Sequence, residues 1–189
     1  MKGFLKNHSY DMVTMLLNQL VLSMFGFSLV LAAMKIDNDA LRNVTSIFSI
    51  LFYLLLLYMK AWDIGFRDKA SVEQGKKTNT PYLGALISLG ANAINYVFAL
   101  FVMLRALLPN VSFFTSIGDV CQAISVLVNG MYTGLLATQV GGAALNSYWF
   151  VFFLTPIPAI LICGLSYYFG LHDVKHTGFF HKKILHKSI

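Results

Sequence analysis

Charge is scarce in this sequence, and it is absent from a long part of it. Only 12% of the 189 residues are Asp, Glu, Lys or Arg, which is about half the share found in soluble domains. Residues 120–171 form a run of 52 residues without any of the four. A soluble surface needs charge, so this scarcity excludes an ordinary soluble domain. With 57% hydrophobic residues, the chain is predicted to be an all-α integral membrane protein with one transmembrane domain over residues 1–189.

Other absences narrow the function. The two cysteines, Cys121 and Cys163, form no CxxC pair, so thiol-redox and zinc-ribbon chemistry have no support. No Walker, GxSxG or HExxH motif occurs, which disfavours ATP or serine hydrolysis. The predicted spans contain no charged residue, which argues against a proton-driven antiporter. The net charge of +6 is concentrated in loops and tails, which is typical of contact with anionic lipid and not with nucleic acid. No cofactor is expected.

Four segments have the length and apolar character of membrane spans. They are residues 12–34, 44–62, 82–104 and 148–171. The first is too long for the apolar region of a signal peptide, so we interpret it as a retained span. A further segment, about 119–142, is long enough to cross a membrane but contains several amides and glycines.

The distribution of basic residues favours four spans. The N-terminus carries two Lys or Arg, the three loops carry two, five and one, and the tail carries four. Four spans place 11 on one side and 3 on the other, whereas five spans give 7 and 7. The positive-inside rule therefore predicts a multi-pass protein of the cell membrane with both termini cytoplasmic. Residues 119–142 would then be a re-entrant hairpin that breaks near Asn129–Gly130, with a fifth span as the alternative.

Small and amide residues share one face of the third predicted span. They recur at helical spacing, which is typical of close helix packing with hydrogen bonds between helices. The members of this face are Gly84, Ser88, Ala91, Asn92, Asn95 and Ala99. A second interpretation makes Asn92 and Asn95 part of a polar cavity.

The segment 119–142 carries a ladder of small residues at four-residue spacing, from Gly130 to Gly142. Such a ladder favours helix packing, while its amides suit a polar lining that binds a neutral or cationic solute. The helix-packing candidates are Gly84, Ser88, Gly130, Gly134 and Gly142. The solute-path candidates are Asn92, Asn95, Gln122, Asn129, Gly130 and Gly134. Pro156 and Pro158 predict a kink in the last span.

Two weaker patterns suggest chemistry near the membrane surface. Asp63 and Asp68 could serve a membrane enzyme acting on lipid or metal, although the intervening Arg67 favours ion pairing. His172 and His176 lie four residues apart and suit a metal, but they supply only two ligands. The tail, residues 172–189, is better interpreted as a basic segment that contacts lipid headgroups. Its candidate lipid contacts are Lys175, Lys182, Lys183 and Lys187.

The sequence thus favours a small non-enzymatic membrane protein that acts as a transporter or channel-like unit, or as the membrane subunit of a larger complex. A membrane enzyme and a pure scaffold or accessory subunit are the alternatives. The expected partners are the lipid bilayer and either further copies of the chain or other membrane subunits.

Overall fold

The computed structural model describes residues 2–36 and 38–174. The predicted lipid contacts Lys175, Lys182, Lys183 and Lys187, and the metal candidate His176, lie outside the described residues. The described chain is mostly helical, which fits the predicted all-α class.

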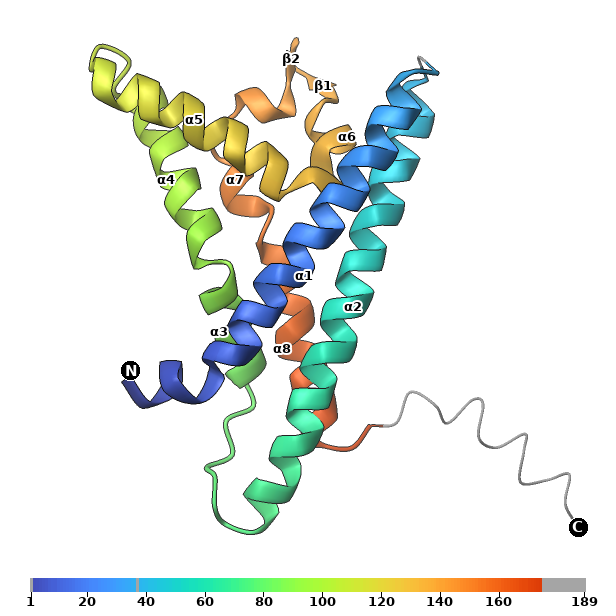
Figure 1. Cartoon of the computed structure of the whole chain (residues 1–189), viewed down its shortest axis with the longest axis vertical. Coiled ribbons are helices and arrows are strands. Elements are labelled where there is room, and N and C mark those ends of the chain that lie inside the picture. The colour runs from blue at the N-terminus through green and yellow to red at the C-terminus, as the bar shows by residue number, and fades with distance from the viewer. Residues whose placement is uncertain (1, 37, 175–189) are drawn as a thin grey trace, which may run out of the picture.

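Two long antiparallel helices form one side of the molecule (Figure 1). They are α1 (Lys2–Met34) and α2 (Asp39–Glu73). Asn38 begins α2, because its Oδ1 accepts a hydrogen bond from the Leu41 backbone N–H at 3.0 Å, which satisfies one of the free donors of the first turn. Both helices extend beyond the predicted spans 12–34 and 44–62, α2 at both of its ends.

The third predicted span is broken. It consists of α3 (Leu83–Ala91) and α4 (Ala93–Leu107), which are bent by 55° at Asn92. The Asn92 Nδ2 donates to the Ser88 carbonyl at 2.9 Å, and such a local side-chain bond competes with the regular helix. The expectation of one continuous helix over 82–104 is therefore corrected to two half-helices.

The segment after α4 also bends sharply. It comprises α5 (Ser112–Val128), the 3-10 turn η1 (Gly130–Tyr132) and α6 (Thr133–Leu136), with a bend of 81°. The break at Asn129 confirms the predicted position. In Figure 1, α6 returns toward the end of the molecule where α5 begins.

A tight hairpin follows α6. Strands β1 (Gln139–Val140) and β2 (Ala143–Ala144) pair antiparallel across Gly141 and Gly142, whose φ angles are 64° and 84°. These angles suit glycine at both central positions of the turn. A Cβ on Gly142 would have no other atom within 4 Å, so this glycine lies in an open turn and not on the helix-packing face that its spacing suggested.

The last elements in the described residues are η2 (Leu145–Ser147), α7 (Val151–Leu154) and α8 (Ile157–Leu171). The interruption lies at Thr155–Pro156, as expected where a proline ring and the missing N–H disrupt a helix. Residues 151–171 nevertheless qualify together as one apolar span.

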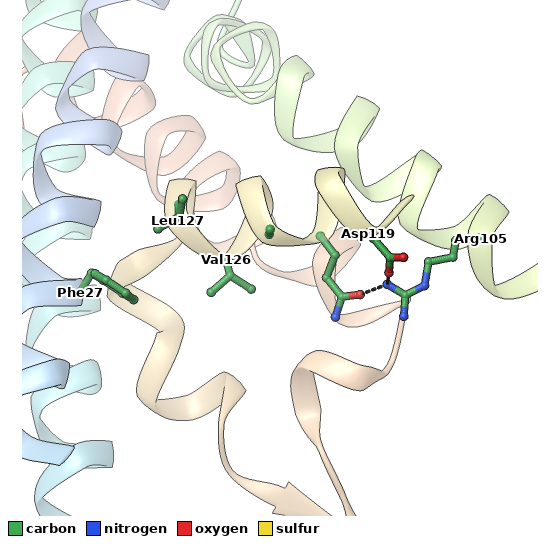
Figure 2. Close-up of a pocket in the computed structure, with 7 residues that line it drawn as sticks. Phe27, Arg105, Asp119, Val126 and Leu127 are labelled. Carbon is green, nitrogen blue, oxygen red and sulfur yellow. Dashed lines mark hydrogen bonds and ion pairs between the residues drawn. The ribbon is translucent and has the colours of Figure 1, made fainter. Parts of the chain in front are cut away.

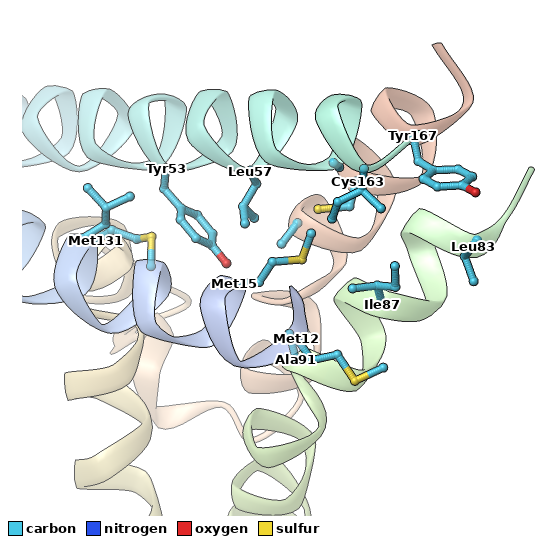
Figure 3. Packing of buried hydrophobic residues seen from close by; sticks show 14 of the residues in the cluster. Met12, Met15, Tyr53, Leu57, Leu83, Ile87, Ala91, Met131, Cys163 and Tyr167 are labelled. Carbon is cyan, nitrogen blue, oxygen red and sulfur yellow. The ribbon is translucent and has the colours of Figure 1, made fainter. Parts of the chain in front are cut away.

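The main core lies between α1, α2, α3 and α8 (Figure 3). Figure 3 shows Met15, Tyr53, Leu57, Ile87 and Cys163 meeting at its centre. A smaller cluster joins α4, α5 and α7 through Ala99, Val102, Cys121 and Phe152. Among the described residues, three helices are long and apolar enough to cross a membrane, or up to five if each bent pair counts as one span.

Candidate functional site

Four amide side chains meet in the interior, and two of them mark the helix breaks. Gln19 comes from α1, Asn92 from the break between α3 and α4, Asn95 from the first turn of α4, and Asn129 from the break between α5 and η1. None is more than 3% exposed. We call these four residues the amide network.

Hydrogen bonds connect the network from one break to the other. Asn95 Nδ2 donates to Asn92 Oδ1 at 2.9 Å and to Gln19 Oε1 at 3.2 Å. Gln19 Nε2 in turn donates to Asn129 Oδ1 at 3.4 Å. At the far end, Asn129 Nδ2 donates to the Ser125 carbonyl at 2.9 Å. Gln19 is therefore the link between two half-helix ends that come from separate parts of the chain.

Serine hydroxyls satisfy the backbone at the second break. The Ser23 hydroxyl accepts from the Gly130 N–H at 2.6 Å and donates to the Leu127 carbonyl. Farther along, the Ser46 hydroxyl accepts from the Gly134 N–H at 2.8 Å. These bonds matter because a broken helix leaves free N–H and carbonyl groups, which are costly to bury unpaired.

Some hydrogen-bonding capacity in this region is unused. Asn95 Oδ1 and the Ser125 hydroxyl are buried and have no hydrogen-bond partner within the described residues. A buried acceptor without a partner destabilises the fold by about 1–3 kcal/mol. A small polar solute that reached Asn95 would therefore gain a hydrogen bond without displacing an existing one.

The network contains no ionisable side chain. Amide oxygens and nitrogens can coordinate a neutral polar molecule or a cation, but they cannot act as acid, base or nucleophile at ordinary pH. The four side chains can therefore donate and accept hydrogen bonds but cannot transfer a proton at ordinary pH.

Gln122 does not join the other amides, contrary to the grouping expected from sequence. Its Oε1 accepts from Arg105 Nη1, and its Nε2 donates to the Asn146 carbonyl at 2.8 Å. Asp119 pairs with the same Arg105 nitrogen at 2.7 Å. Gln122 and Asn129 share a face of α5, but seven residues separate them by about 10 Å along a helix. Gln122 therefore faces the end of α4 rather than α1.

Three of the predicted packing glycines lie where helices approach closely. A Cβ on Gly84 would overlap the Cys163 carbonyl of α8, one on Gly130 the Ser23 carbonyl of α1, and one on Gly134 the Ser46 hydroxyl of α2. Ser88 is also buried, at 1% exposed. The glycines near the second break thus let η1 and α6 lie directly against α1 and α2.

The two aspartates considered for an enzyme do not share a site. Asp63 pairs with Arg67 at 3.2 Å, and both side chains are more than half exposed. Asp68 is buried and accepts from Lys77 at 2.5 Å and from Tyr167 at 3.1 Å.

His172 contacts the Tyr168 carbonyl through Nδ1 at 2.9 Å. In the described part of the chain, no three His, Cys, Asp or Glu side chains are grouped to hold a metal.

Sequence reasoning missed Gln19, which holds the network together. The available signal was an amide inside an otherwise apolar segment, with Ser23 four residues later on the same helical face.

No family model matches this chain, and neither a curated protein nor a solved structure matches it.

Proposed function

We propose that this chain is a non-enzymatic membrane protein that conducts a small neutral or cationic polar solute, with the amide network closing the path in the conformation described. The observation that carries the proposal is the Gln19 bridge between two broken helices. In membrane transporters, broken helices place backbone dipoles and free polar groups at mid-membrane binding sites.

The proposed topology has four spans and one re-entrant segment. It consists of α1, α2, the bent pair α3–α4, and α7–α8, with α5–η1–α6 entering and leaving from one side. Three features lie at the same end of the molecule: the beginning of α1, the loop after α2, and the end of α8 (Figure 1). The hairpin of β1 and β2 lies at the opposite end. With the charge distribution of the loops, this arrangement favours cytoplasmic termini.

The absence of charged side chains from the amide network supports a small neutral or cationic polar molecule as the solute. A buried ammonium or carboxylate would favour ions of the opposite sign. Amides provide donors and acceptors in equal measure, and Asn95 Oδ1 supplies one acceptor that the described structure leaves unpaired. A solute that displaces Gln19 from Asn95 or Asn129 would break the hydrogen-bonded connection between the two helix breaks.

Solute flux into proteoliposomes tests the proposal. Purified protein is reconstituted, and entry of urea, glycerol and K⁺ is followed by light scattering or by a K⁺-sensitive dye. We expect at least one of these solutes to enter faster than into protein-free vesicles. Gln19→Met should change that rate severalfold, because it removes both hydrogen bonds of the bridge while keeping the side-chain length.

The matched control is Gln139→Met, because Gln139 is exposed in β1. It should leave the rate unchanged. If neither the wild-type protein nor Gln19→Met conducts any of the three solutes, the proposal fails, and the membrane-subunit alternative takes its place.

A further inference from the structure

An open groove lies along α5, apart from the amide network. Its volume is about 520 Å³, and it is bounded by one residue of α1, one of α4 and one face of α5 (Figure 2). The lining residues are Phe27, Arg105, Asp119, Gln122, Ala123, Val126 and Leu127.

The groove is polar at one end and apolar at the other. Figure 2 shows Arg105 and Asp119 at one end, with Val126, Leu127 and Phe27 toward the other. Arg105 lies in the last turn of α4 and Asp119 in the middle of α5, whereas Val126 and Leu127 lie in the last turn of α5, which runs obliquely from the end of α4 toward α1 (Figure 1). If the proposed membrane topology holds, this gradient matches that of a lipid, whose headgroup is shallow and whose acyl chains are deep.

The charges at the polar end select among headgroups. Arg105 and Asp119 are 2.7 Å apart and their side chains are 37% and 67% exposed. Their contacts with each other and with Gln122 use Arg105 Nη1, so Nη2 and Nε can meet a phosphate in the bidentate manner of guanidinium groups. The second carboxylate oxygen of Asp119 can accept from an ammonium group. An anionic headgroup has no ammonium group for Asp119, and its negative charge would be repelled by the aspartate.

We propose that this groove binds a zwitterionic phospholipid, with its phosphate on Arg105, its ammonium on Asp119 and an acyl chain along Val126, Leu127 and Phe27. Arg105 and Asp119 together have no net charge, and neither does a zwitterionic headgroup. The arginine can therefore contact the phosphate while the aspartate contacts the ammonium group. Phosphatidylethanolamine fits best, because its primary ammonium donates hydrogen bonds to a carboxylate.

Competition between two lipids tests the site. The full chain is purified in detergent micelles that contain equal amounts of phosphatidylethanolamine and phosphatidylglycerol, and retained lipid is quantified by mass spectrometry. We expect retained phosphatidylethanolamine to exceed phosphatidylglycerol by about tenfold, the effect of roughly one charge-assisted hydrogen bond. Equal retention, or a preference for phosphatidylglycerol, would overturn the proposal.

Paired variants assign the preference to this groove. The double variant Arg105→Gln/Asp119→Asn removes both charges and should abolish the preference. The matched control Arg67→Gln/Asp63→Asn removes an exposed Arg–Asp pair elsewhere and should retain it. If the first double variant does not fold, Ala123→Phe is used instead, because it keeps both charges but fills the groove. Ala123→Phe should abolish the preference, and a retained preference would overturn the proposal. The flux assay is repeated with the same variants. A variant that loses the lipid preference but still conducts solute would show that the two proposals stand or fall independently.

Discussion

Gln19, in the middle of α1, donates a hydrogen bond to Asn129, which ends α5 and lies 110 residues later in the chain. The same Gln19 accepts from Asn95 at the beginning of α4. One side chain thus connects the helix breaks at Asn92 and Asn129, the first of them through Asn95. Gln19 and Asn129 are 2% and 3% exposed, so their hydrogen bond lies in the interior of the protein.

Replacing Gln19 should destabilise the fold measurably. Gln19→Met leaves the Asn129 acceptor without this donor, and we expect the free energy of unfolding to fall by about 1–2 kcal/mol. With Asn129→Leu in addition, the total loss should be smaller than the sum of the single losses by about 0.6–1.7 kcal/mol. Equilibrium unfolding in mixed micelles measures both quantities. Strict additivity of the two losses would show that the bond contributes nothing.

Two glycines of α3 should respond differently to the same substitution. Gly84→Ala places a methyl group against the backbone of α8, whereas the methyl group of Gly90→Ala would meet only the end of the Met12 side chain, at 2.8 Å. Backbone cannot move as a flexible methionine can. We expect Gly84→Ala to lower the midpoint of thermal unfolding by about 2–10 °C, and Gly90→Ala to change it little. Equal midpoints would contradict close packing of α3 on α8.

The loop after α2 should loosen when Asp68 loses its charge. Lys77 reaches back to the buried Asp68, which Tyr167 also contacts. Asp68→Asn weakens this charge-assisted bond, so we expect trypsin to cut at Lys76 and Lys77 several times faster. Asp63→Asn is the control, because the exposed Asp63–Arg67 pair contributes little. Identical cutting rates in the two variants would show that Asp68 does not hold the loop.

Cysteine labelling should place both ends of the α5–α6 segment on one side of the membrane. In a background of Cys121→Ala and Cys163→Ala, Ser112→Cys and Ser147→Cys should react with a membrane-impermeant maleimide added to the same side. Gln74→Cys, in the loop after α2, should react only from the opposite side. Labelling of positions 112 and 147 from opposite sides would make α5–α6 a fifth span and place the C-terminal tail outside.

The helix breaks show how far local sequence reasoning extends. The break at Asn129–Gly130 was predictable, because a Gly-containing amide sequence interrupts an otherwise apolar run and such residues disfavour the helix locally. The break at Asn92 was not, because the pattern of small residues from Gly84 to Ala99 continues through it without a change of spacing. That face remains buried on both sides of the bend. The spacing of small residues therefore predicts which face is buried, but not whether the helix is continuous.

The amides show the same limit at the candidate site. Asn95 and Asn129 were identified as polar residues in apolar segments, but their connection depends on Gln19, whose position relative to them is set by how α1 packs. Gln122 was grouped with Asn129 because both are amides of the segment 119–142. The oblique path of α5 places Gln122 against Arg105 instead.

The sequence by itself determined the apolar, mostly helical character of this protein, the approximate helical segments and the interruption of residues 119–142, because hydropathy and helix propensity are properties of neighbouring residues. Only the tertiary structure decided which amides meet, which glycines lie against backbone, and where the Arg105–Asp119 pair opens onto an apolar groove. Those relationships depend on the angles and depths at which separate helices pack. Such angles result from many side-chain contacts acting together, and no single segment of the sequence contains them.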